Sequence, residues 1–339
     1  MSVRSRLRFM LCTLLAAATL LAAAMLGGSA RAEEGLAITE LAPLEKPVTS
    51  FGAAEAGGWL YIYGGQLGSA HKYSVDTQAR QLLRLNINQP GKWELVAEGP
   101  PRTGLAMVGY AGKIYRIGGW EAKNAAGEKW NLHSSRDFAR FDPKSGQWQD
   151  LAPMPRGRSS HDAAMLGSKL YVIGGWELAG EGEGDWHTTA YVTDLAAESP
   201  EWKEIAAPGF CRRALAVAGQ GGKVYAIGGM DDSNETTTAV SIYDPQSNAW
   251  SKGPAVPGEN VDGFGAAAFG TEAGLFASTR SGAVYRLNQD GQAWTQIGKL
   301  NHPRSFHRLI IAEGRLLFVG GTAKAGKVAQ VESAELAKK

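Results

Sequence analysis

The sequence has little cysteine, and this scarcity limits how the chain can be stabilised. Among its 339 residues only Cys12 and Cys211 are cysteines. Cys12 belongs to an N-terminal leader described below, so Cys211 has no partner for an internal disulfide and stability must come from packing. Apolar residues at helical spacing are also absent over any stretch of several turns, and this excludes a helical bundle and favours strands.

Charge of either sign is not in excess. The formal net charge is +2 at pH 7, and residues 1–32 contribute four arginines and no acid. Without them 31 basic residues face 33 acidic ones, a net charge of −2. This balance gives no basis for attraction to nucleic acid or to a membrane surface, so we predict neither as a partner.

Residues 1–32 have the layout of a secretory signal peptide. Three arginines precede an apolar run over residues 9–26, and small residues at 30–32 form a cleavage site. We predict cleavage before Glu33, export to the periplasm or the exterior, and no membrane span in the mature chain. The alternative is an uncleaved membrane anchor, since the run exceeds the roughly 7 to 15 residues usual for a signal core.

Glycine, in contrast, is abundant and periodic. Short apolar strands end in a glycine pair about every 50 residues. The pairs are Gly64-Gly65, Gly118-Gly119, Gly174-Gly175, Gly228-Gly229 and Gly320-Gly321, with a decayed copy at residues 274–278. A β-carbon at these strand ends would obstruct close packing near an axis, and glycine also adopts backbone angles that other residues avoid.

Each repeat predicts four antiparallel strands. In the third unit these cover residues 162–166, 170–173 and 191–195, and the fourth strand starts at Trp202. Tryptophans recur in this register and are predicted to pack one blade against the next; they are Trp93, Trp148, Trp202, Trp250 and Trp294. Six sheets with exposed edges would aggregate, and arranging them around an axis protects those edges.

The two ends of the array predict how the ring closes. The sequence of residues 38–44 resembles that of the predicted outer strand at residues 148–154. The last unit stops after its third strand, near residue 336. We predict that the N-terminal strand completes the last blade. The expected domain is residues 33–339, with repeats near 47–100, 101–154, 155–208, 209–256, 257–301 and 302–336 plus 36–44.

These motifs resemble those of the kelch-repeat family over nearly all of the mature chain. The resemblance implies an all-β fold, a six-bladed β-propeller with four antiparallel strands per blade. It does not imply one function, because the same scaffold carries binding modules, adaptors and a few enzymes.

The loops that enter each first strand and those that follow each glycine pair are expected on one face. Arginines and tryptophans in these loops predict a site for a carboxylate or sulfate and a stacked sugar or peptide side chain. The predicted ligand-binding residues are Arg102, Arg158, Arg212, Arg213, Arg304, Trp120, Trp176 and Trp186. The alternative for each arginine is structural, with its donors on loop carbonyls and acids.

Two motifs on the same face have residue types that bind metals. Kelch domains similar to that of galactose oxidase bind copper through tyrosine and histidine, with a cysteine cross-linked to a tyrosine. Cys211 and His307 fall at suitable places, but Phe306 lacks a phenol and residues 260–264 offer no tyrosine, so we predict no copper oxidase. The acidic cluster at residues 231–235 lacks a known calcium-loop spacing, and we predict neither a metal nor a cofactor.

We predict an exported ligand-binding or interaction module for an anionic carbohydrate or an acidic peptide. The alternative is an isomerase, because the leader, length and six units are also similar to the periplasmic sialic-acid mutarotases (N-acetylneuraminate epimerases). That resemblance implies an arginine clamp on the sugar carboxylate and an acid–base pair that opens the ring. The candidates for the acid and base are His161, His307, Glu121 and Glu177.

Overall fold

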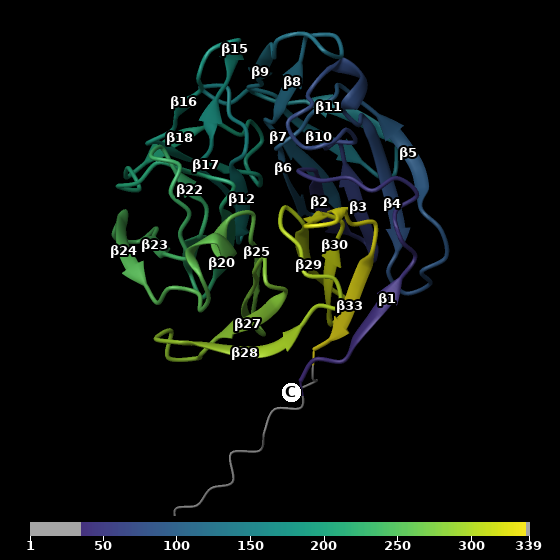
Figure 1. The fold of residues 1–339 in the computed structure, drawn as a ribbon. Helices are drawn as coiled ribbons and strands as arrows, with labels where there is room; N and C mark the ends of the chain where they lie inside the picture. The colour runs from purple at the N-terminus through teal and green to yellow at the C-terminus, as the bar shows by residue number, and fades with distance from the viewer. Residues whose placement is uncertain (1–34, 337–339) are drawn as a thin grey trace, which may run out of the picture. The chain divides into compact units, whose positions relative to one another are not determined.

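The computed structural model describes residues 35–336, and the leader predicted at residues 1–32 lies outside this range. Within it, six four-stranded antiparallel sheets are arranged around an axis, as Figure 1 shows. Two short 3-10 turns, η2 (Val75–Thr77) and η3 (Asn260–Gly263), are the helical elements of these residues. None of residues 35–336 forms a helix with the length and apolar character needed to cross a membrane.

Each sheet is one blade, and the strands are given from the axis outward. Blade 1 contains β2 (Gly52–Ala56), β3 (Trp59–Tyr63), β4 (Gln81–Asn86) and β5 (Glu94–Glu98). Blade 2 contains β6 (Ala106–Tyr110), β7 (Lys113–Ile117), β10 (Phe138–Asp142) and β11 (Gln147–Asp150). Blade 3 contains β12 (Asp162–Leu166), β13 (Lys169–Ile173), β17 (Ala190–Asp194) and β18 (Lys203–Ile205), which confirms the four predicted strands to within one residue.

The remaining blades follow the same plan. Blade 4 contains β20 (Ala216–Gln220), β21 (Lys223–Ile227), β23 (Val240–Asp244) and β24 (Ala249–Gly253). Blade 5 contains β25 (Ala267–Thr271), β26 (Gly274–Ser278), β27 (Ala283–Leu287) and β28 (Trp294–Lys299). Blade 6 contains β29 (Arg308–Ala312), β30 (Arg315–Val319), β33 (Val331–Glu335) and β1 (Ile38–Leu41).

The ring closes through the N-terminal strand, as predicted. β1 pairs antiparallel with β33, with Ile38 opposite Ala334 and Leu41 opposite Val331. The six inner strands β2, β6, β12, β20, β25 and β29 each contact the next, and β29 contacts β2. Closure therefore joins residues from the two ends of the described chain in one sheet.

Within residues 35–336, packing between blades forms the core without a disulfide. Six clusters of buried apolar side chains each lie between two neighbouring blades. The outer-strand tryptophans connect the blades further. Trp148 packs on Tyr63 of blade 1, with 5.5 Å between ring centres, and its indole N–H has no partner among the described residues. In the other four, the indole N–H donates to a carbonyl of the preceding blade. These bonds run from Trp93 to Ala42, from Trp202 to Ala152, from Trp250 to Ala206 and from Trp294 to Pro254. The predicted blade-to-blade role of these tryptophans is confirmed.

The glycine pairs lie where adjacent blades meet most closely. A β-carbon on Gly174 would lie 2.5 Å from the Arg212 carbonyl oxygen of the next blade, and its φ of 74° is in the left-handed region. The following Gly175 N–H donates to that same carbonyl at 2.8 Å. The glycine pair therefore allows a strand end to bond directly to the neighbouring loop.

Loops on one face of the ring form four small sheets of their own. They are β8 (Trp120–Ala122) with β9 (Leu132–Ser134) and β15 (Ala179–Gly180); β14 (Trp176–Glu177) with β16 (Asp185–Trp186); β19 (Arg212–Arg213) with β22 (Met230–Asp231); and β31 (Thr322–Ala323) with β32 (Gly326–Lys327). A seventh apolar cluster, which includes Trp120, Leu132 and Leu178, fixes the two longest loops against each other.

Candidate functional site

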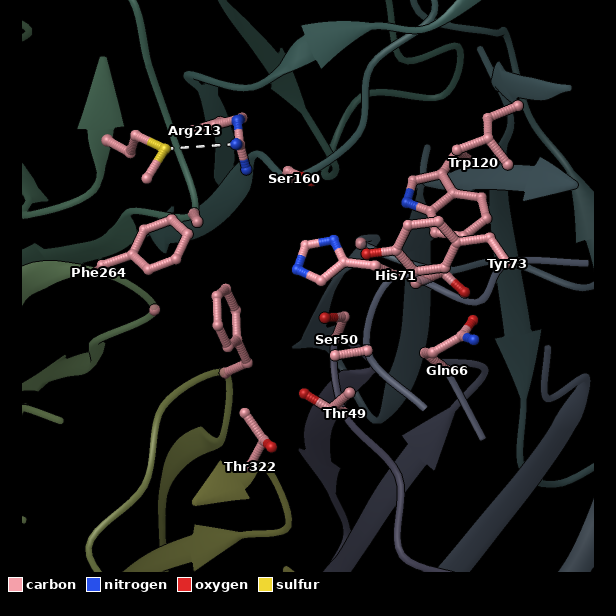
Figure 2. A pocket seen from close by; sticks show the side chains of 18 of the residues that line it. Thr49, Ser50, Gln66, His71, Tyr73, Trp120, Ser160, Arg213, Phe264 and Thr322 are labelled. Atoms are coloured by element: carbon pink, nitrogen blue, oxygen red, sulfur yellow. Dashed lines mark hydrogen bonds between the residues drawn. The ribbon is translucent and has the colours of Figure 1, made fainter. Parts of the chain in front are cut away.

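A cavity of about 1420 Å³ opens among these loops, and all six blades contribute to its lining. Figure 2 shows its side chains, with Arg213 and Phe264 on one side and Tyr73 and Trp120 on the other. The loops before the inner strands and the loops after the glycine pairs both line it. The predicted tryptophans Trp120, Trp176 and Trp186 are among the lining residues.

A chain of backbone hydrogen bonds, here called the collar, surrounds the deep part of this cavity. Its members occupy the same position in each blade and are Ser50, Gly104, Ser160, Ala214, Gly265 and Phe306. Five bonds join them, each from the N–H of one member to the carbonyl of the previous one, at 2.7 to 2.9 Å. All six have φ between 51° and 69°, a left-handed conformation that is strained in the four members other than glycine.

One side of the cavity is cationic and aromatic, and we call it the arginine wall: Arg213, Trp176, Trp186 and Phe264. The Arg213 guanidinium carbon lies 4.4 Å from the ring centre of Trp176 and 5.3 Å from that of Trp186. Its one hydrogen bond among the described residues goes to the Met230 sulfur at 3.3 Å, and its Nε is buried without a partner. Burial lowers the pKa of Arg213, yet a guanidinium remains charged at neutral pH.

The other side carries an aromatic wall of His71, Tyr73, Trp120 and Trp130. Tyr73 packs against Trp120 at 5.1 Å and against Trp130 at 5.0 Å between ring centres. His71 lies parallel to Trp130 at 6.3 Å, and its φ of 59° is again left-handed. Trp130 keeps 42% of its surface exposed, so an aromatic face remains open to a ligand.

Two histidines line the deep part of the cavity as neutral imidazoles. Burial, with the positive charges of Arg158 and Arg308, holds the pKa of His161 well below its usual range, and neither ring nitrogen has a protein partner. Burial, with Arg304 and Arg308 nearby, lowers the pKa of His307 to about 3. His307 hydrogen-bonds through Nε2 with the Ser278 hydroxyl at 2.5 Å.

An ion pair across the axis forms the floor of the cavity, and sequence reasoning missed it. Arg308 donates to Asp162 at 2.9 Å and to the carbonyls of Phe51 and Leu105 at 2.7 Å, so one side chain connects four blades. Below it lies a second cavity of about 200 Å³. The signal was present, because Asp162 and Arg308 are charged at a strand start where the other inner strands have glycine or alanine.

Four of the five predicted arginines lie outside the cavity lining. Arg158, Arg212 and Arg304, the latch arginines, each donate to the first glycine carbonyl of their own blade, at 2.7, 2.9 and 3.2 Å. Their side chains are at most 4% exposed, and burial lowers the pKa of each to about 10. They have the structural role that the sequence left open, and Arg213 is the predicted arginine that lines the cavity.

Ion pairs hold the fourth arginine and both predicted glutamates. Arg102 pairs with Glu121 at 2.7 Å and with Asp137 at 2.5 Å. Glu177 accepts from Arg156 at 2.6 Å and from the Gly157 N–H at 3.0 Å. Neither Glu121 nor Glu177 is part of the cavity lining, whereas His161 and His307 are. The structure therefore brings together two of the four acid–base candidates.

The residues of the two metal-like motifs have ordinary local roles. The Asp231 carboxylate accepts the backbone N–H groups of Ser233 and Glu235 at 3.0 Å, as in a turn. Cys211 is a free, partly exposed thiol, and burial raises its pKa. In residues 35–336, no three side chains of histidine, cysteine, aspartate or glutamate gather in a way that could hold a metal ion.

Six four-stranded sheets around an axis, with one cavity among the loops of all six, define the class as a six-bladed β-propeller with a ligand-sized mouth. The chain belongs to the kelch-repeat proteins, because residues 50–268 match the family model described as the KLHDC2/KLHL20/DRC7 Kelch-repeats domain.

The individual relatives share about a quarter of their aligned residues with this chain. Kelch-like protein 25 of Xenopus tropicalis is 25% identical over 274 residues, covering 79% of this chain and 43% of that protein. Kelch-like protein 35 of Mus musculus is 24% identical over 198 residues, covering 58% of this chain and 29% of that protein. The chain thus spans less than half the length of these relatives. A solved structure of YjhT is similar in fold, with a TM-score of 0.69, 19% identity, and 88% of this chain and 97% of that chain covered.

Proposed function

We propose that this kelch β-propeller is an exported binding module that takes an anionic ligand, a carbohydrate or an acidic peptide, in the cavity. The observation that carries the proposal is Arg213. Its guanidinium has no carboxylate partner among residues 35–336, and it lies between aromatic rings at the cavity surface. Export rests on the leader pattern of residues 1–32.

The arginine wall suits an anion for two physical reasons. A guanidinium offers paired N–H donors in a plane that matches a carboxylate or sulfate, and aromatic surroundings reduce the competition from water. The rings of Trp176 and Trp186 hold the guanidinium in place before a ligand arrives, so little side-chain freedom is lost on binding.

The test compares ligands and arginines. Thermal-shift measurements would use glucuronic acid, N-acetylneuraminic acid, hexaglutamate peptide and neutral glucose, with the wild type, Arg213→Ala, Arg213→Lys and the surface control Arg80→Ala. We expect at least one anionic ligand to raise the melting temperature of the wild type and of Arg80→Ala by mass action. Arg213→Ala should abolish the shift and Arg213→Lys should weaken it. No shift with any anion, or an equal shift in Arg213→Ala, would remove the proposal.

A second candidate is sugar mutarotation, and one observation favours it. His161 is 3% exposed, lines the cavity and has two ring nitrogens without a hydrogen bond, so its neutral imidazole is placed to accept a hydrogen bond from a sugar hydroxyl. Burial and the charges of Arg158 and Arg308 keep its pKa low, which makes it a weak base. Anomer exchange of N-acetylneuraminic acid followed by NMR tests this function. Faster exchange with the wild type than with His161→Gln would support it, and equal rates with protein and with buffer alone would exclude it.

A further inference from the structure

The aromatic wall has the features of a second subsite, separate from the arginine wall. Its rings come from loops of blades 1 and 2, whereas the arginine wall comes from loops of blades 3, 4 and 5. Figure 2 places Tyr73 and Trp120 across the cavity from Arg213 and Phe264. Each wall has its own aromatic contacts, Tyr73 with Trp130 at 5.0 Å and Trp176 with Trp186 at 5.6 Å.

Two hydrogen-bonding atoms of the cavity lining have no partner among residues 35–336, and Figure 2 shows one of their residues, Gln66, next to Tyr73. Gln66 is 3% exposed, and its amide nitrogen donates to the Lys72 carbonyl at 3.1 Å, while its Oε1 is buried and unpaired. The Thr49 hydroxyl is likewise buried without a partner. Both residues line the cavity. Buried polar atoms are normally satisfied, so an unpaired acceptor and a hydroxyl at a cavity wall indicate a ligand with hydroxyl groups.

The cavity is also large for a single small ligand. Its volume of about 1420 Å³ exceeds the roughly 300–1,000 Å³ of most small-molecule pockets. A monosaccharide held at Arg213 would fill only part of this volume. An elongated ligand would fill more of it and contact both walls.

We infer that the cavity binds an acidic oligosaccharide across two subsites, an inference that rests on the proposed function. One acidic sugar unit places its carboxylate on Arg213, and another unit stacks a ring face on Trp130 and Tyr73 with its hydroxyls on Gln66 and Thr49. The chemistry at this second wall favours a glycan over a peptide. Aromatic faces next to hydroxyl and amide groups match the alternating apolar faces and hydroxyl rims of sugar rings. Lys327, which donates to the Leu67 carbonyl beside Gln66 at 2.7 Å, adds a positive charge that suits an acidic sugar unit.

The test measures affinity as a function of chain length. Isothermal titration calorimetry would compare galacturonic acid with trigalacturonate, and N-acetylneuraminic acid with its α2,8-linked trimer. In at least one series we expect the trimer to bind at least tenfold more tightly than its monomer, more than the threefold that three equivalent units give by statistics. Arg213→Ala should weaken monomer and trimer alike.

Substitutions at the aromatic wall separate this inference from the proposed function. Trp130→Ala should remove the gain from chain length and leave the monomer affinity unchanged, Trp130→Phe should retain most of the gain, and Thr49→Val should weaken the trimer by about fivefold. Leu95→Ala is the control, because Leu95 is an exposed apolar residue outside the cavity, 59% exposed against 42% for Trp130.

Equal affinity of monomer and trimer in both series, or a gain that survives Trp130→Ala, would overturn the two-subsite arrangement while Arg213-dependent anion binding stands. Tighter binding of hexaglutamate than of either trimer would also overturn it. Absence of binding by every anion would overturn the proposed function, and this inference with it.

Discussion

Arg212 and Arg213 are adjacent in the chain and belong to different parts of the molecule. Arg212 is 4% exposed and bonds to the carbonyls of Gly228 and Ala239 inside its blade. Arg213 faces the cavity and bonds to one sulfur. Both lie in the two-residue strand β19, where successive side chains point to opposite sides. Two adjacent residues therefore belong to two different parts of the molecule. One part is the blade frame, defined as the repeated residues that join the blades. The other is the ligand face, defined as the residues that line the cavity.

The sharpest test of the frame is removal of its closing strand. Deletion of residues 33–46 removes β1, the buried Leu44 and the Ala42 carbonyl that accepts the Trp93 N–H. We expect the melting temperature to fall by at least about 10 °C, because one blade loses a strand and two interfaces lose packing. Deletion of residues 337–339 is the control. An unchanged melting temperature after the longer deletion would contradict closure through β1.

The adjacent arginines give the next largest effect. Arg212→Ala should lower the free energy of unfolding by about 3–5 kcal/mol, since it leaves the buried Gly228 carbonyl without a donor and opens a cavity. Arg213→Ala should change it by less than about 1 kcal/mol, while it removes ligand binding. Urea denaturation of both variants measures the difference. Similar losses of stability in the two would mean that Arg213 also belongs to the frame.

A smaller effect is expected from pH. Burial and the charge of Arg158 lower the pKa of His187 to about 4, and this residue donates to the Gly157 carbonyl away from the cavity lining. In the unfolded chain its pKa is about 6.5, so the unfolded state binds the proton first and stability falls as pH drops from about 6.5 to 4.

His187→Gln keeps a donor but cannot be protonated in that range, so its stability should fall less steeply than that of the wild type. Melting temperatures between pH 7 and 4 measure the two slopes, and His302→Gln, which removes the contact with Glu40, is measured for comparison. Parallel curves for wild type and His187→Gln would show that His187 does not contribute to acid sensitivity.

The frame could be predicted from the sequence because it repeats. Glycine pairs, outer tryptophans and the copy of the outer strand at residues 38–44 each recur at a fixed spacing, and the structure confirms the strands and the closure they predicted. Blade 5 also has the form expected from its decayed repeat. It lacks the glycine pair, and only residues 279–282 connect β26 to β27.

The ligand face could be predicted only in part. All the arginines of its loops look alike in sequence, and the direction of each side chain depends on strand pairing that forms only in the fold. A signal was nevertheless present. Arg158, Arg212 and Arg304 each precede a glycine pair by 16 residues and bond to it, whereas Arg213 has no counterpart in other blades. The structural arginines therefore occupy a position that recurs from repeat to repeat, whereas the arginine that lines the cavity occupies a position that does not.

The collar affects how the side chains at the cavity, and with them the ligand, can change between related propellers. Its five bonds use only backbone atoms, so the side chain at each collar position is not needed for the connection it makes. Serine, alanine and phenylalanine already occupy four of these left-handed positions. A propeller of this kind can therefore acquire a new ligand by single replacements at the rim of its axis, without new connections between its blades.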